Sequence, residues 1–112
     1  MKVLVTATSN NENSLMDPRF GRAKFWYISD LDKGKSYFID NSKSESFEHG
    51  AGMQAAASAL EEGVDVIVTG SVGPKAFDII KRKGVQVFLG DSEKSVVDNL
   101  NDFKKNLLSE QK

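Results

Sequence analysis

The chain has 112 residues, no cysteine and a formal net charge of −1, with 39% hydrophobic and 28% charged residues. This length suits one domain with one core, and the balanced charge gives no reason to expect a nucleic acid or a membrane as partner. Without cysteine there is no disulfide, thiolate ligand or cysteine nucleophile, and no apolar stretch has the length of a signal peptide or membrane span, so we expect a cytoplasmic location.

The first half of the chain predicts three strands. Residues 2–7 carry a short apolar run. Residues 24–29 and 36–40 are joined by a short glycine-containing link, which is typical of an antiparallel hairpin. Residues 8–22 are polar, and their proline and glycine exclude regular structure. A loop of about fifteen residues is long for a compact domain, and such loops are more often functional than shorter ones.

The second half of the chain alternates helices and strands. Residues 50–62 and 74–83 predict helices that end at glycines. Residues 64–69 and 85–89 predict strands, and the β-branched run in the first of them favours burial on both faces.

A last helix is expected to be capped by Asp91 or Ser92. Its apolar stripe should consist of Val96, Leu100, Phe103 and Leu107. The stripe of the first helix should consist of Met53, Ala56, Ala57 and Leu60.

The element order βββαβαβα predicts an α/β fold. A hairpin and two right-handed crossovers give a mixed five-stranded sheet with helices on both faces, and strands 2–7 and 64–69 should be parallel neighbours. We expect one domain, residues 1–108, followed by a frayed tail, residues 109–112.

Several polar segments should gather where the parallel strands end. These are the loop 8–22, the turn 70–73 and the turn 90–91. Residues 49–52 reach the same edge if the first helix runs antiparallel to the strand that follows it. Ligands of open α/β sheets commonly bind at such an edge.

The turn 70–73 joins a strand to a helix. Gly70 and Gly73 permit close backbone approach, and the N–H groups of such a turn can hold an anion. The alternative is a tight connection without a ligand. The turn is not a Walker loop, and Ser71 lacks a Gly-x-Ser-x-Gly context.

Two further segments carry candidate ligand-binding groups. His49, the only histidine, precedes Gly50 and Gly52 at a helix start, where it is either a ligand or a local hydrogen-bonding residue. Arg19 and Arg22 would suit an oxyanion, because guanidinium groups match oxyanion geometry. Alternatively, both arginines are solvated and the phenylalanine between them plugs the sheet edge.

Acidic residues and methionines offer weaker signals. A two-metal nuclease would need several acids to converge on one edge, and we expect Asp40 and Asp65 to lie away from the edge that carries Asp91. Soft sulfur atoms of Met16 and Met53 suit a metal cluster or simple packing. The acids that lie near strand ends are Asp17, Asp40, Asp65 and Asp91.

Four motifs occur in a specific order: D-P-R-F-G-R-A at 17–23, H-G-A-G at 49–52, G-S-V-G-P-K-A-F at 70–77 and G-V-Q-V-F at 84–88. Together with the aromatic strand that follows the first motif, they resemble the dinitrogenase iron–molybdenum cofactor biosynthesis family in its small stand-alone form. The similarity extends to about Phe103.

The resemblance implies a ribonuclease-H-like three-layer αβα fold without nuclease activity. It also implies a non-enzymatic carrier or nitrogen-fixation accessory for an iron–sulfur-type metallocluster, such as the iron–molybdenum cofactor or a precursor, with a cluster-donor or cluster-acceptor protein as partner. His49 would be the metal ligand. Ser71 stands where some cofactor-binding relatives have cysteine, so binding would be labile. The implied cofactor-binding residues are His49, Gly50, Gly52, Arg19, Arg22, Gly70, Ser71 and Gly73.

Three functional hypotheses follow. The first is a binding protein for a metallocluster or another anionic small ligand. The second is a protein-interaction module that docks a partner through Phe20 and Met16, without a cofactor. The third is a metal-dependent hydrolase or nuclease, which the fold class also hosts.

Overall fold

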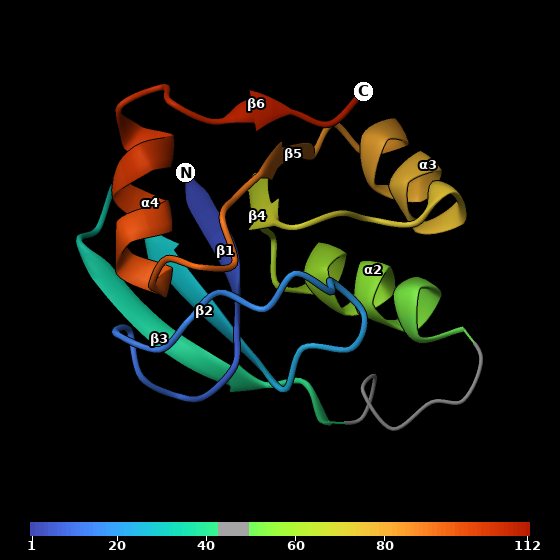
Figure 1. Cartoon of the computed structure of the whole chain (residues 1–112). Coiled ribbons are helices and arrows are strands. Elements are labelled where there is room, and N and C mark those ends of the chain that lie inside the picture. Colours follow the sequence, from blue (N-terminus) through green and yellow to red (C-terminus); the bar gives the residue numbers. More distant parts are fainter. Residues whose placement is uncertain (43–49) are drawn as a thin grey trace.

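A six-stranded mixed sheet forms the centre of the computed structural model, which describes residues 1–42 and 50–112 (Figure 1). The sheet order is β3-β2-β1-β4-β5-β6. The strands are β1 (Lys2–Ala7), β2 (Phe25–Asp30), β3 (Lys35–Asp40), β4 (Val66–Thr69), β5 (Gln86–Leu89) and β6 (Ser109–Glu110). The helices are α2 (Ala51–Glu61), α3 (Pro74–Arg82) and α4 (Val96–Lys104). None of these helices is long and apolar enough to cross a membrane.

The strand pairings confirm the predicted centre of the sheet. β1 and β4 are parallel, with Leu4 opposite Ile67, and β4 is parallel to β5. β2 and β3 form the expected antiparallel hairpin, and β2 pairs antiparallel with β1. The C-terminal ends of β1, β4 and β5 therefore share one edge of the sheet.

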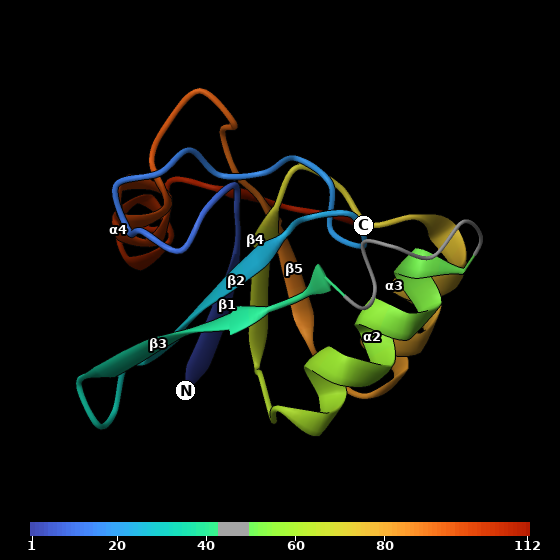
Figure 2. The same ribbon diagram turned by 90° about the horizontal axis from the view of Figure 1, so that it is seen from below.

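The side chains of β1 alternate between two separate cores, because successive residues of a strand point to opposite faces. Leu4 packs in the core under α2 and α3, whereas Val3 and Val5 pack in the core under α4. Figure 2 shows α2 and α3 on one side of the sheet and α4 on the other. The predicted layer arrangement is confirmed, and the ribonuclease-H-like relationship stays a prediction.

The predicted five-stranded sheet is wrong, because residues expected to fray form a sixth strand. β6 pairs antiparallel with β5, with Ser109 opposite Leu89. The N–H group of Gln111 then donates to the carbonyl of Val87 at 2.8 Å. A strand of two residues has no alternating pattern that sequence could reveal.

The predicted helix faces are correct only in part. α2 turns a row of alanines toward the sheet and leaves Met53 exposed, so small side chains set a close helix–sheet distance. α4 is capped by Ser95, whose Oγ accepts the Asp98 N–H at 3.1 Å, and not by Asp91 or Ser92. Leu107 lies beyond the end of α4 and is exposed. The buried alanines of α2 are Ala51, Ala55, Ala56 and Ala59.

The central strand β4 gives a direct test of the packing. Ile67 is fully buried, so Ile67→Ala should lower the free energy of unfolding by about 2–5 kcal/mol, from lost burial and a residual cavity. Urea denaturation would measure the change. Leu107→Ala, at a side chain that is 67% exposed, is the control and should change stability little. Equal effects of the two variants would contradict the described core.

Candidate functional site

A cleft of about 440 Å³ lies at the C-terminal edge of β1 and β4. Three chain segments form it: the loop after β1, the start of α2 and the turn between β4 and α3. This is the gathering that the sequence predicted for the loop, the helix start and the glycine turn. The lining residues are Pro18, Arg19, Phe20, Gly21, Arg22, Gly50, Ala51, Gly52, Ser71 and Gly73.

Hydrogen bonds fix the first segment to the strand ends. The Thr6 Oγ1 hydroxyl donates to the carbonyl of Asp17 and lies 2.9 Å from Thr69 Oγ1. The Asp17 N–H donates to the Thr6 carbonyl at 3.0 Å, and the Ser71 N–H donates to the Pro18 carbonyl at 3.2 Å. The loop is therefore attached to both β1 and the turn after β4.

Two glycines permit this close approach of main chains. A Cβ atom on Gly70 would lie 2.7 Å from the Cα of Pro18, and one on Gly21 would lie 2.8 Å from the nitrogen of Gly52. Any side chain at these positions would force the segments apart. Gly70, which the sequence placed among the binding residues, thus packs against Pro18 and is absent from the cleft lining.

Both helices at the cleft begin with glycine. Gly50 is the N-cap of α2 with φ of 77°, and Gly73 is the N-cap of α3; within the described residues neither helix start has a side-chain cap. α4, away from the cleft, has the conventional cap from Ser95. The first N–H groups of a helix have no carbonyl partner within it, and they carry partial positive charge. Two such helix starts therefore face one cleft, and in α3 the free N–H groups lie at Gly73 and beyond Pro74, because proline has none.

Arg19 and Arg22 add positive charge to the same cleft. The Arg19 side chain is 64% exposed, and its Nε and Nη2 lie 3.2 and 3.1 Å from the carboxylate oxygens of Asp17. That carboxylate also accepts the main-chain N–H of Arg19 at 2.9 Å. Asp17 thus orients Arg19 from inside the protein, with a side chain only 5% exposed.

Asp17 is a site residue that sequence reasoning missed, since it was considered only as an acid of a nuclease. The order Asp17–Pro18–Arg19 in the sequence could have indicated that Asp17 positions Arg19. An aspartate often accepts the N–H two residues later and so forms a local turn. That turn places the guanidinium of Arg19 at the cleft.

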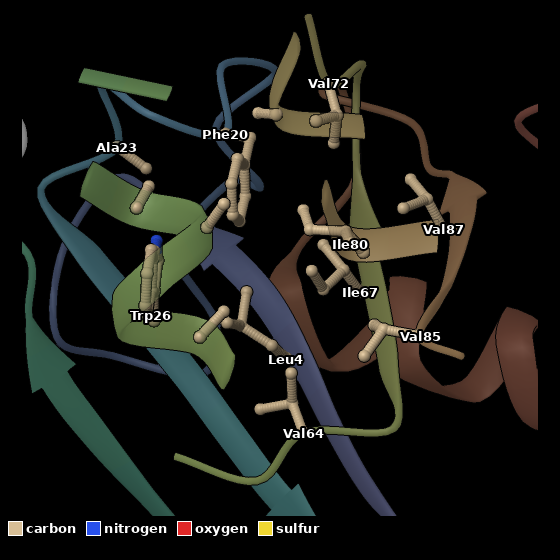
Figure 3. Close-up of a cluster of buried hydrophobic side chains, with 14 of the residues drawn as sticks. Leu4, Phe20, Ala23, Trp26, Val64, Ile67, Val72, Ile80, Val85 and Val87 are labelled. Carbon is tan, nitrogen blue, oxygen red and sulfur yellow. The ribbon is translucent and has the colours of Figure 1, made fainter. Parts of the chain in front are cut away.

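Phe20 connects the cleft to the core. Its ring stacks on Trp26 with centroids 5.6 Å apart and an interplanar angle of 8°. Figure 3 shows both rings within the same buried cluster. Phe20 is 3% exposed and Met16 is 1% exposed, so neither side chain can dock a partner protein. The interaction-module hypothesis is wrong in the residues it named.

An apolar extension of about 290 Å³ continues from the cleft, with Gly50, Gly52 and Gly73 lining both. Met53 lies on this extension and is 41% exposed, whereas Met16 is buried in the core under α4. Of the two methionines, only Met53 is accessible to a ligand at this edge. The other residues of the extension are Pro74, Lys75 and Ala76.

The remaining predicted residues are His49 and those of the turn 90–91. His49 is outside the described residues. Gly90 packs against Asn99, Met16 and Val68, so the third predicted turn does not reach the cleft.

The acids near the strand ends are dispersed in the part of the chain that the structure describes. No group of three or more potential metal ligands of the His, Cys, Asp or Glu type occurs in residues 1–42 and 50–112. Asp65 accepts the Lys2 N–H near the start of β1, as expected. The prediction for Asp40 is wrong, because Asp40 pairs with Phe25, which pairs with Ala7 at the end of β1. Asp91 accepts the Glu93 N–H within its own turn.

Comparison with known proteins identifies the family. The sequence model of the dinitrogenase iron–molybdenum cofactor family matches residues 1–106, and the chain belongs to this family. An uncharacterized Methanocaldococcus jannaschii protein, MJ0580, is 29% identical over 79 residues, which are 69% of this chain and 67% of that protein.

Solved structures share the fold. The apo form of the orange protein from Desulfovibrio gigas has a TM-score of 0.92 and 32% identity, over 98% of this chain and 92% of that one. TM1290 of Thermotoga, described as a candidate NifB protein, has a TM-score of 0.85 and 26% identity, over 97% and 91%. The protein PH0822, at 18% identity and a TM-score of 0.80 over 99% and 95%, is similar in fold.

The glycines of the turn 70–73 should differ sharply in their tolerance of alanine. Gly70→Ala should lower the free energy of unfolding by about 1–3 kcal/mol, because its Cβ would overlap Pro18. At Gly73, φ is −62° and a Cβ would meet no atom of the described residues within 4 Å, so Gly73→Ala should cost only a few tenths of a kcal/mol, from the weaker N-cap preference of alanine. Urea denaturation of the pair measures this. A Gly70→Ala chain as stable as Gly73→Ala would contradict the close approach.

Proposed function

We propose that this cleft binds an anionic metallocluster of the iron–sulfur type, such as the iron–molybdenum cofactor or a precursor, or a related anionic ligand. The protein is then a non-enzymatic carrier or accessory. One observation carries the proposal: two helices without side-chain caps and two arginines line one cleft. Family membership and the similarity to the orange protein, whose structure is that of an apo form, support it.

The charge and shape of the cleft suit such a ligand. Anions are stabilised at helix N-termini and by guanidinium groups. Among residues 1–42 and 50–112, no atom lies within 4 Å of a Cβ placed on Gly50 or Gly73, so these residues leave the main chain accessible there. The volume of about 440 Å³ is within the range of ligand-binding clefts, about 300–1,000 Å³.

The donor set favours a reversible, labile complex. The chain has no cysteine, so no protein thiolate can bond to a metal, and Ser71 supplies only a hydroxyl. His49 precedes the N-cap of α2 in sequence, and we propose its imidazole as the protein ligand to a metal of the cluster. Electrostatic attraction provides the rest of the affinity, which suits a carrier that must release its cargo.

Transfer requires a second protein. We propose that a cluster-donor or cluster-acceptor protein approaches over the apolar extension beside Met53 and Lys75, because this surface adjoins the cleft. The acids that a metal-dependent hydrolase would need do not gather within the described residues, so the arrangement favours a binding protein over a hydrolase.

Arg22 gives a test of anion binding. Tetrathiomolybdate, a coloured sulfido dianion, serves as the probe in anaerobic titrations. Arg22→Gln should weaken its binding at least about tenfold, because a hydrogen bond to a charged group contributes about 1.5–3 kcal/mol. Arg82→Gln, at the last turn of α3 and 78% exposed, is the matched control and should bind like wild type. Equal affinities of all three chains would contradict the proposed site.

His49 is tested by cluster assembly. Anaerobic reconstitution with ferrous iron and sulfide should leave less iron on His49→Ala than on wild type, with an altered visible spectrum. Tetrathiomolybdate affinity should change less in His49→Ala than in Arg22→Gln. The imidazole is proposed to bond to a metal of the cluster, whereas the molybdenum of this probe is already bonded to four sulfides. Identical iron content and spectra in wild type and His49→Ala would show that His49 is not the ligand.

A further inference from the structure

Gln111 makes an unusual contact with the turn that lines the cleft. Its Nε2 donates to the carbonyl of Val72 at 2.9 Å, and the Val72 N–H donates to its Oε1 at 3.0 Å. The side-chain amide thus pairs with the main chain of Val72 as a neighbouring strand would. The two residues are 39 positions apart in the sequence.

The segment that carries Gln111 is attached to the sheet by few bonds. β6 consists of two exposed residues that pair with β5. Beyond it, the Gln111 N–H donates to the Val87 carbonyl at 2.8 Å. Figure 1 shows this segment crossing from α4, past β5, toward α3. A short edge strand of this kind opens at low cost in free energy.

Val72 is one of the two inner residues of the turn 70–73. Its neighbours Ser71 and Gly73 both line the cleft, and its own side chain is buried in the core under α2 and α3. Gly70 and Gly73 make the main chain of the turn intrinsically free to move. Contacts from outside the turn must therefore set its conformation.

A continuous series of contacts runs from Gln111 to the cleft. Gln111 is hydrogen-bonded to Val72. The preceding residue, Ser71, donates its N–H to the Pro18 carbonyl at 3.2 Å. Arg19 and Ser71 form an isolated parallel bridge. Displacing the turn would therefore move a wall of the cleft and its attachment to the arginine-bearing loop.

We propose that Gln111 is a positioning residue: its carboxamide holds the turn 70–73 in the ligand-binding conformation and couples residues 107–112 to occupancy of the cleft. This rests on the anion-binding function proposed above. Because coupling between two equilibria is reciprocal, a bound anion should stabilise the attachment of the segment as much as the segment strengthens binding. Loss of the carboxamide should weaken binding between about 5- and 50-fold.

The central variant is Gln111→Met, which keeps the length of the side chain and adds no charge but removes both hydrogen bonds. Glu110→Met is the matched control, because Glu110 is the exposed neighbour in β6. Tetrathiomolybdate titration gives the affinity of each chain. Amide hydrogen exchange at Ser71 follows the turn itself, since the Ser71 N–H bonds to Pro18 and not to Gln111.

Gln111→Met should bind the probe 5- to 50-fold more weakly than wild type and exchange the Ser71 amide faster, while Glu110→Met resembles wild type in both. Wild-type affinity in Gln111→Met would overturn the proposal and reduce Gln111 to a packing role. If wild type binds no probe, the function proposed above fails instead. Unchanged Ser71 exchange in the ligand-free variant would then overturn the role of Gln111 separately.

The wild-type chain provides a test that needs no variant to fold. Saturation with tetrathiomolybdate should slow exchange of the Gln111 N–H, which is not part of the cleft lining and bonds to Val87. No slowing in a chain that binds the probe would contradict the coupling.

Discussion

The site depends on the close approach of main chains at Gly70 and Gly21. At Gly70 the turn after β4 meets the loop after β1, and at Gly21 that loop meets the start of α2. No side chain separates these segments, so their N–H groups and the neighbouring arginines come within one cleft. The sheet below supplies rigidity, because β1 and β4 are parallel neighbours at its centre.

The sequence predicted most of the fold because its strongest signals are periodic. The β-branched run of β4, the hairpin of β2 and β3 and the glycine ends of the helices all correspond to described elements. The predicted strand number was wrong, and the predicted face of α2 was wrong in part, because the deciding contacts are distant in sequence. β6 forms only because it pairs with β5. The buried face of α2 is the face with the small alanine side chains, because these let the helix pack closely on the sheet.

The sequence indicated which segments form the candidate site, but not what each residue in those segments does. Arg19, Arg22, Ser71 and the glycines at both helix starts line the cleft as the motifs indicated. Gly70 looks equivalent to Gly73 in sequence, yet only the structure distinguishes a packing glycine from a cleft-lining one. The order Asp17–Pro18–Arg19 could have indicated the local turn that places Arg19, whereas the contact of Gln111 with Val72, 39 positions away, required coordinates because no sequence pattern marks it.

We propose that an anion binds where the two helices begin. Titration of the isotopically labelled wild-type chain with tetrathiomolybdate, followed by main-chain amide chemical shifts, locates the bound anion. We expect the largest shifts at Gly50, Gly52, Ser71 and Gly73, with affinity that falls as salt is raised. Shifts centred elsewhere, or binding independent of salt, would contradict it.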